Sequence, residues 1–305
     1  MNLVSAFFRL IRWPNLVFIL LTQTLFYFCI YLPLYHQHKT GKLVLLMTAS
    51  VFIAAAGYII NDYFDLNIDQ INKPQKNVVD KVIHRRGAII WHLILSFAGI
   101  VITAFAVGLH HWYLMLANVF CIALLWFYST SFKRQLLVGN IIISILTAWT
   151  ILILFFAFSS PSNAFNTDDP VSVKFFRLAF LYAGFAFIIS LIREAVKDME
   201  DMEGDARYGC RTLPIVAGVK ATKIYCATWL VVLIATLGIL QVYVLQFGWW
   251  PAVLYSVLLV IVPLLYSLAK LRKATYTKDF AQLSSYTKLI MLAGILSMIF
   301  FSFYF

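Results

Sequence analysis

Long runs of apolar residues, separated by short segments that carry most of the charge, repeat along the whole chain of 305 residues. A helix needs about 20 mostly apolar residues to cross the hydrocarbon core of a bilayer. Nine runs have this length, and we expect a membrane-spanning helix in each: residues 14–35, 43–61, 87–109, 112–129, 136–158, 175–193, 222–246, 250–269 and 286–304. The pattern predicts an all-α integral membrane protein with nine transmembrane helices.

The composition supports this interpretation. Hydrophobic residues make up 62% of the chain and charged residues only 12%, whereas soluble domains carry about 25% charged residues. No linker or low-complexity tract divides the sequence, so we expect one domain over residues 1–305. Its two halves, about 1–158 and 175–305, each contain one of the acidic clusters described below.

Lysine and arginine are distributed unevenly among the connections between the spans. If the N-terminus lies in the cytoplasm, 20 of these residues fall on the cytoplasmic side and 4 on the outer side. Cytoplasmic loops of membrane proteins carry such an excess. We therefore expect a cytoplasmic N-terminus and an outer C-terminus. Orientation in the membrane also explains the net charge of +11 better than a nucleic-acid partner does.

Two acidic clusters with the same Asp-x-x-Asp-x-x-x-Asp spacing follow the second and the sixth span. Their aspartates, the first of which comes directly after Asn61, are Asp62, Asp65 and Asp69, then Asp198, Asp201 and Asp205. On a helix, this spacing keeps three side chains within an arc of about 60°. We expect each triplet to line one face of a helix that continues out of its span, on the cytoplasmic side.

Three carboxylates on one helix face repel one another and need a cation nearby. Their hard oxygen ligands suit Mg²⁺, which prefers carboxylates, water and substrate phosphates. Metals that prefer thiolate or imidazole are disfavoured, because no Cys or His shares either face. Two facing clusters would hold more than one Mg²⁺, with a diphosphate bridging between them.

Diphosphate binding also calls for basic side chains near the metal, since Arg forks onto phosphate oxygens and Lys acts as a point charge. The candidates on the cytoplasmic side are Lys73, Lys133, Arg134, Arg193 and Lys197. Loop Lys and Arg residues serve equally well to set topology and contact lipid head groups. Arg193 and Lys197 precede the second cluster on one helix, where pairing with aspartates and diphosphate binding are both open.

The two clusters together resemble those of the UbiA superfamily of membrane prenyltransferases. Tyr128 and Lys133 match that family's Tyr-x-x-x-x-Lys element, and Asn140 follows at a familiar distance. The resemblance covers essentially the whole chain. It implies nine helices around a central cavity, with the clusters at its cytoplasmic mouth. The prenyl tail would lie in this cavity, which would open laterally to lipid.

The resemblance also implies roles for individual residues. The side chains implied to bind Mg²⁺, and through it the diphosphate, are Asn61, Asp62, Asp65, Asp69, Asp198, Asp201 and Asp205. Lys133 would contact the diphosphate directly, with Arg193 and Lys197 assisting. Tyr128 is expected to belong to the same diphosphate site. The reaction implied is transfer of a prenyl group from a diphosphate to an electron-rich, lipophilic acceptor, with release of diphosphate.

The acceptor depends on a weaker signal. The segment from Arg12 to Asn15 reads Arg-Trp-Pro-Asn and resembles branches that act on isoprenoid glycerol phosphates or naphthoate. We expect a geranylgeranyl-like donor and an isoprenoid glycerol phosphate acceptor. An aromatic acceptor of a quinone pathway is the alternative within the same reaction type. A metal-binding transporter or scaffold without catalysis is the alternative outside it.

Overall fold

The computed structural model describes residues 3–68, 79–80, 82–159 and 168–305. Helices account for most of them. The described part of the chain contains no β-strand, only one isolated bridge between Val79 and Ile83.

Nine segments of the described residues are long and apolar enough to cross a membrane. In chain order they are α2, η1 and α3 (Trp13–Leu25, Phe26–Tyr31, Leu32–Tyr35), α4 (Thr40–Phe64), α6 (Arg85–Val107), α7 (Trp112–Thr130), α8 (Val138–Phe158), α9 (Pro170–Glu200), α12 (Gly218–Leu245), α13, η4 and α14 (Trp250–Ser256, Val257–Ile261, Val262–Lys273), and α15, η5 and α16 (Thr277–Leu296, Ser297–Phe300, Phe301–Tyr304). Shorter helices precede or connect them: α1 (Leu3–Leu10), η2 (Leu109–His111), η3 (Phe132–Arg134), α10 (Met202–Arg207) and α11 (Leu213–Val216). The predicted all-α class with nine spans is confirmed.

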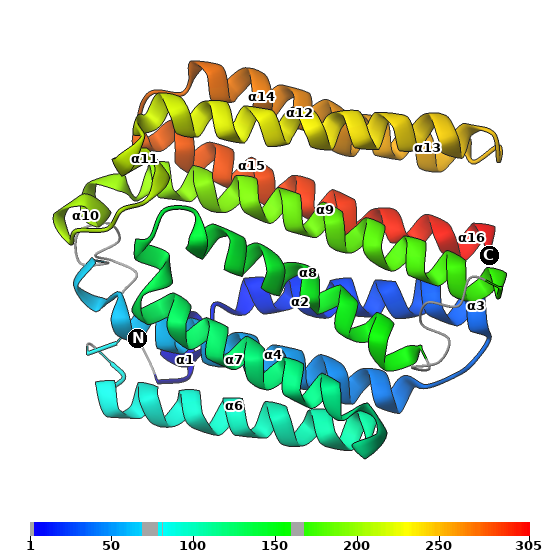
Figure 1. Cartoon of the computed structure of the whole chain (residues 1–305), viewed down its shortest axis with the longest axis horizontal. Coiled ribbons are helices and arrows are strands. Elements are labelled where there is room, and N and C mark those ends of the chain that lie inside the picture. Colours follow the sequence, from blue (N-terminus) through cyan, green and yellow to red (C-terminus); the bar gives the residue numbers. More distant parts are fainter. Residues whose placement is uncertain (1–2, 69–78, 81, 160–167) are drawn as a thin grey trace.

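The spanning helices lie along the long axis of the molecule, with α6 at one edge and α12 and α14 at the other (Figure 1). The N-terminus lies at one end of this bundle and the C-terminus at the opposite end, as an odd number of crossings requires. The last residues of α4 and the helix α10 both lie at the N-terminal end. Both acidic clusters therefore belong to the same end. Its assignment to the cytoplasm stays a prediction from the charge pattern.

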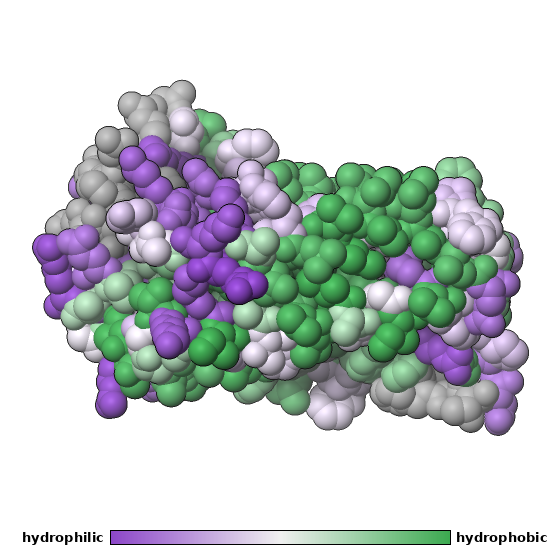
Figure 2. All heavy atoms as spheres, turned by 90° about the horizontal axis from the view of Figure 1, so that it is seen from above, coloured by the Kyte–Doolittle hydropathy of each residue, from purple (hydrophilic) through white to green (hydrophobic). Residues whose placement is uncertain are grey.

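The surface of the bundle carries a broad apolar band. Figure 2 shows apolar side chains over the middle of the visible face, while hydrophilic side chains gather toward the two ends. Large apolar side chains stay open to the surroundings, for example Phe105 at 78% and Ile239 at 72% exposure. Such exposure is costly in water and natural in lipid, because the tails surround the helices. The band therefore fits a membrane-spanning body.

Inside the bundle, the helices are held by close backbone approach and by polar contacts. A Cβ atom at Gly99 of α6 would lie 2.7 Å from Cγ1 of Ile53 on α4, so only glycine fits there without a shift. Small residues allow such approach between membrane helices. Gln23 of α2 is fully buried and donates to Oγ of Ser50 (2.9 Å) and to the carbonyl oxygen of Thr150 (2.8 Å). These bonds join α2 to α4 and α8.

The ninth span begins earlier than the sequence pattern predicts. We expected it at residues 286–304, but α15 starts at Thr277. The side chain of Asp279 accepts hydrogen bonds from the backbone N–H groups of Thr275 (2.8 Å) and Tyr276 (2.9 Å), and with the N-cap residue Tyr276 it forms a capping box at the start of the helix. Lys288, expected near the start of the span, consequently lies deep within α15.

Candidate active site

The first acidic cluster lies where α4 ends. Helix α4 stops at Phe64, and Asp65 leaves the helical conformation with φ −86° and ψ 0°. Its N–H still bonds to the carbonyl oxygen of Asn61 at 2.9 Å. The expectation that one continuous helix carries the triplet is therefore wrong. Asp69 and Lys73 lie outside the described residues.

The second cluster repeats this break at the equivalent position. Helix α9 ends at Glu200, and Asp201 has φ −94° and ψ 5°. The N–H of Asp201 bonds to the carbonyl oxygen of Lys197 at 2.8 Å. Asp205 follows in the short helix α10, so this triplet spans two helices. Aspartate has a low helix propensity, and its charge is unfavourable at a helix C-terminus, which explains why both helices end at the middle aspartate.

Cations from other segments neutralise the first cluster. Nη2 of Arg12 donates to Oδ1 of Asp62 at 2.6 Å. Nζ of Lys133 forms an ion pair with Oδ1 of Asp65. Asn61 completes the group by donating from Nδ2 to the other oxygen of Asp65 at 2.8 Å. The predicted proximity of Lys133 to the cluster is thus present, and Arg12 is an additional partner.

The second cluster has a different environment. Asp198, in the last turn of α9, accepts a hydrogen bond from the neutral Nδ2 of Asn140 at 2.9 Å. The two neighbouring cations turn to Glu194 instead: Arg193 at 2.7 Å and Lys197 at 3.3 Å. Glu194 is only 7% exposed. Pairing with the aspartates and diphosphate binding were both open for Arg193 and Lys197; the structure pairs both residues with Glu194, which is not an aspartate of either cluster.

The loop 131–137, between α7 and α8, links the two clusters. Lys133 in this loop reaches Asp65 of the first cluster, while Asn140, in the first turn of α8, reaches Asp198 of the second. The backbone N–H of Arg211, which follows the second cluster, donates to the carbonyl oxygen of Arg134 at 2.7 Å. One short segment therefore brings side chains of both clusters into a common site. The side chain of Arg134 itself is exposed.

A glycine fixes the position of Lys133. A Cβ atom at Gly139 would lie 2.9 Å from Cα of Lys133 and 3.2 Å from the carbonyl oxygen of Phe132. It would also lie 3.2 Å from the ring of Tyr128, the first residue of the Tyr-x-x-x-x-Lys element. The end of α7 at Tyr128 and the loop at Phe132 and Lys133 therefore both pack directly on the backbone of α8. Any side chain at residue 139 would push Lys133 out of place.

The comparison with known proteins agrees with this arrangement. A model of the UbiA prenyltransferase family matches residues 17–301. The chain belongs to the UbiA prenyltransferase family. This confirms the family and the class of enzyme that the sequence predicts, whereas the roles of individual residues stay predictions.

Relatives within the UbiA family are close enough to compare over most of the chain. The digeranylgeranylglyceryl phosphate synthase of Haloquadratum walsbyi is 36% identical over 214 residues, which cover 70% of this chain and 67% of that protein. A solved structure concerned with digeranylgeranylglyceryl phosphate synthase has a TM-score of 0.65 at 24% identity, covering 98% of this chain and 99% of that one. A UbiA homologue from Archaeoglobus fulgidus bound to GPP and Mg²⁺ has a TM-score of 0.59 at 16% identity, covering 96% and 99%. At these identities the structural likeness shows the shared fold.

The oxygen atoms of the site fit a hard divalent cation. Oδ1 of Asn61 is buried and has no hydrogen-bond partner within the described residues, beside the carboxylates of Asp62 and Asp65. Over those same residues, no three carboxylate, imidazole or thiol groups converge into a ready metal site. Arg12 and Lys133 instead supply the positive charge that these oxygens need. The donor set is of the kind that Mg²⁺ prefers.

Two residues of the site, Glu194 and Arg12, were not predicted from the sequence. Glu194 had a usable signal, because a carboxylate one turn before Asp198 inside an apolar span needs a reason to be there. Arg12 reaches Asp62 from a turn between α1 and α2, where it has the left-handed conformation at φ 51°. That contact joins residues 50 positions apart and has no local sequence signal.

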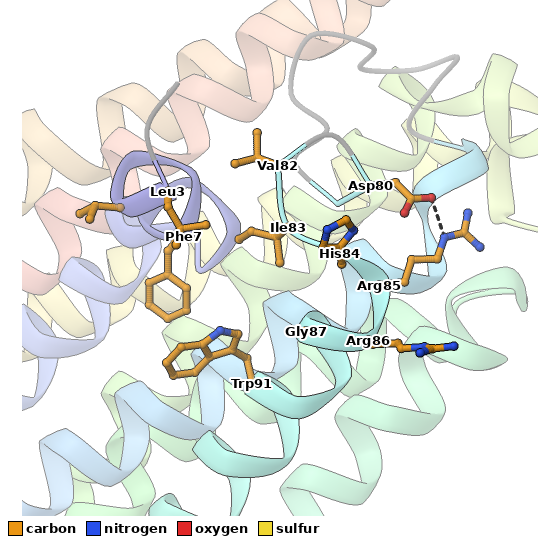
Figure 3. Close-up of a pocket in the computed structure, with 11 residues that line it drawn as sticks. Leu3, Phe7, Asp80, Val82, Ile83, His84, Arg85, Arg86, Gly87 and Trp91 are labelled. Atoms are coloured by element: carbon orange, nitrogen blue, oxygen red, sulfur yellow. Dashed lines mark hydrogen bonds and ion pairs between the residues drawn. The ribbon is translucent and has the colours of Figure 1, made fainter.

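The structure also contains an open pocket of about 880 Å³ away from the clusters, between α1 and the start of α6 (Figure 3). Apolar side chains such as Phe7 and Trp91, whose ring centroids lie 4.9 Å apart, line it together with Arg85 and Arg86. Arg85 is paired with Asp80 at 2.9 Å. No described candidate site residue lines this pocket. It is therefore distinct from the site at the aspartates.

Proposed function

We propose that this UbiA-family prenyltransferase transfers a geranylgeranyl-like group from its diphosphate to an isoprenoid glycerol phosphate. In the reaction, the bond between the first prenyl carbon and the diphosphate oxygen breaks, and diphosphate leaves with the electron pair. The free hydroxyl oxygen of the acceptor forms the new ether bond, and its proton passes to solvent. The names of the relatives support this acceptor, since they are digeranylgeranylglyceryl phosphate synthases.

The link between the two clusters carries the proposal. Lys133 contacts the first cluster and Asn140, seven residues later, contacts the second, so both clusters border one site. A single carboxylate cluster would hold a cation, but a diphosphate needs positive charge on more than one side. Two aspartate-rich helix ends joined by a short basic loop supply that arrangement. The same end of the bundle carries the N-terminus, which we assign to the cytoplasm from the charge pattern.

Each part of the site has a proposed task. When bound, Mg²⁺ supplies a Lewis acid that neutralises the charge developing on the leaving diphosphate. The side-chain oxygen of Asn61 and the carboxylates of both clusters would suit this ion as ligands. Lys133, now paired with Asp65, would donate hydrogen bonds to the diphosphate. Tyr128 and Gly139 hold the loop in position, and Asn140 orients the carboxylate of Asp198.

The basic residues divide into two groups in this proposal. Lys133 and Arg12, which pair with Asp65 and Asp62, would be the cations nearest to the diphosphate oxygens. Arg193 and Lys197 stay with Glu194 and contribute positive charge to the inner wall of the site. Lys73, Asp69 and Arg134 keep the diphosphate and metal roles that the sequence predicts. The prenyl tail lies among the helices, where water is excluded and aromatic faces stabilise an allylic cation.

Release of pyrophosphate tests this function directly. Purified protein in lipid or detergent is mixed with geranylgeranyl diphosphate and a panel of acceptors, comprising geranylgeranylglyceryl phosphate, aromatic quinone precursors and water alone. We expect Mg²⁺-dependent release, coupled to an extractable lipid product, with the glycerol phosphate acceptor and its loss in EDTA. Turnover of an aromatic acceptor in its place would overturn the acceptor assignment. Tight metal binding without turnover of any pair would favour a transporter or scaffold.

A further inference from the structure

A lysine within α15, in the ninth span, has no role in the chemistry described above. Lys288 follows the first residue of α15, Thr277, by eleven positions, or about 16 Å along the helix axis. Its side chain is half-buried, and Nζ donates to Oδ1 of Asn15 on α2 at 3.1 Å. Ionisable residues within membrane-spanning helices are costly and usually belong to a functional site.

The surroundings of Lys288 carry an excess of positive charge. Arg193, Lys197 and Arg12 all act electrostatically on its ammonium group. Arg12 is neutralised by Asp62 of the first cluster. Arg193 and Lys197 share the single carboxylate of Glu194. Among the described residues, the three cations Arg193, Lys197 and Lys288 face Glu194 and also Asp198, which interacts with Lys197, so positive charges outnumber negative ones by one.

These cations also have unused hydrogen-bonding capacity. Nε of Arg193 is buried and has no partner within the described residues. The ammonium group of Lys288 has three N–H donors, of which the contact to Asn15 uses one. Leaving a buried donor unpaired costs free energy, so an arrangement of this kind calls for an acceptor. A planar guanidinium, an ammonium and an amide together suit the tetrahedral oxygens of a phosphate.

We propose that Lys288, with Arg193 and Asn15, forms the subsite for the phosphate monoester of the acceptor lipid. This subsite rests on the proposed function and is separate from the aspartate clusters, which hold the diphosphate of the donor. The excess positive charge and the unused N–H donors suit the oxygens of a phosphate monoester.

The position of the subsite agrees with the chemistry of the acceptor. Glycerol has three oxygens, and in a prenylglyceryl phosphate one bears the first prenyl ether and another the phosphate. The reacting hydroxyl oxygen is therefore separated from the phosphate-bearing oxygen by at most three carbons. Asn15 lies three residues after Arg12, which contacts Asp62, and Arg193 lies five residues before Asp198. A phosphate held by Lys288 and Arg193 thus borders the metal site without occupying it.

Kinetics with two acceptors distinguish a phosphate subsite from a simple clamp between α2 and α15. In Lys288→Gln we expect KM for geranylgeranylglyceryl phosphate to rise roughly 10- to 100-fold, the loss typical of one charged hydrogen bond. KM for the prenyl diphosphate should stay unchanged. With the phosphate-free prenylglycerol, wild type and variant should be equally slow. Lys278→Gln, an exposed lysine on the same helix, is the matched control and should behave as wild type.

A binding measurement covers the case in which Lys288→Gln folds poorly. The Lys288→Arg variant keeps the charge, and we expect it to bind geranylgeranylglyceryl phosphate in EDTA within a fewfold of wild type. Unchanged acceptor KM in Lys288→Gln, or an equal loss with the phosphate-free acceptor, would overturn the subsite alone. A wild-type enzyme that turns over prenyl diphosphate with other acceptors but never with a glycerol phosphate would overturn the proposed function, and the subsite with it.

Discussion

Helix α9 carries aspartates at both of its ends, and they are held in opposite ways. At the start, Asp169 accepts hydrogen bonds from the N–H groups of Val171 and Ser172, both at 3.1 Å, and from the hydroxyl of Ser172 at 2.6 Å. At the other end, Asp198 accepts from the neutral amide of Asn140. A helix dipole favours a carboxylate at the N-terminus and disfavours one at the C-terminus. Only the second placement needs positive charge from elsewhere.

The end of α4 repeats the unfavourable placement. Asp62 and Asp65 lie at its C-terminus, as Asp198 and Asp201 do in α9. The two clusters share the break in their helix backbone. In the first, Arg12 and Lys133 form ion pairs with Asp62 and Asp65; in the second, Asp198 accepts a hydrogen bond from Asn140. A carboxylate at a helix start serves stability, whereas carboxylates gathered at two helix ends are a cost that function explains.

Replacing one aspartate at each end of α9 should give the largest difference in activity between two variants. We expect Asp201→Ala to lower kcat/KM roughly 100- to 1,000-fold, because it removes one oxygen ligand of the charge-stabilising group. Asp169→Ala should keep the wild-type rate, since it only caps the helix. Pyrophosphate release from geranylgeranyl diphosphate measures both. Equal losses in the two variants would contradict a functional difference between the ends.

Removing Lys133, one of the two cations paired with the first cluster, should have the next largest effect on activity. Lys133→Met should lower kcat roughly 10- to 100-fold, because a positive charge aimed at the diphosphate is lost. Arg207→Gln is the control at the same end of the bundle, since Arg207 is exposed and paired with Glu203 at 2.7 Å. Steady-state kinetics at saturating Mg²⁺ measure both variants. A Lys133→Met enzyme with the wild-type kcat would remove Lys133 from the site.

A smaller effect should follow from moving Lys133 without changing it. Gly139→Ala places a Cβ atom 2.9 Å from Cα of Lys133, and we expect kcat to fall about tenfold as the loop shifts. Gly238→Ala in α12 meets no atom within 4 Å and should keep full activity. The same assay with both alanine variants checks this. Unchanged kcat in Gly139→Ala would show that the loop tolerates displacement.

The smallest effect concerns the favourable end of α9. Hydrogen bonds from Ser172 and Val171 hold the pKa of Asp169 below its ordinary value. The cap therefore stabilises the folded protein above the unfolded-state pKa of about 3.9, and the contribution is lost as the pH falls through the lower folded-state pKa. Thermal unfolding in detergent should show Asp169→Ala slightly less stable than wild type at pH 7. The difference should shrink below about pH 4; a constant difference across this range would contradict the capping role.

Much of this architecture could be predicted from local pattern. Apolar runs identified all nine spans, because crossing a bilayer imposes a length that a single sequence displays. The spacing of the aspartates identified the candidate site. The break of each helix at Asp65 and Asp201 was missed, since periodicity measures spacing and does not report where a helix terminates.

Contacts between segments far apart in the sequence could not be predicted from the sequence. Arg12 meets Asp62 from 50 positions away, and Asn140 meets Asp198 from 58 positions away. Lys288 was expected near the edge of its span, because polar residues at the start of α15 interrupt the apolar run. Which cation pairs with which carboxylate depends on how helices pack, and tertiary packing leaves no trace in local composition.

Binding of a non-reacting prenyl diphosphate analogue tests most directly whether the two clusters act together. Affinity is measured by titration against wild type, Asp65→Ala and Asp201→Ala, each with Mg²⁺ and with EDTA. We predict tight, Mg²⁺-dependent binding to wild type and its loss in both variants, since each helix end holds part of the metal–diphosphate group. Binding that survives EDTA, or that survives either substitution unchanged, would contradict a shared site.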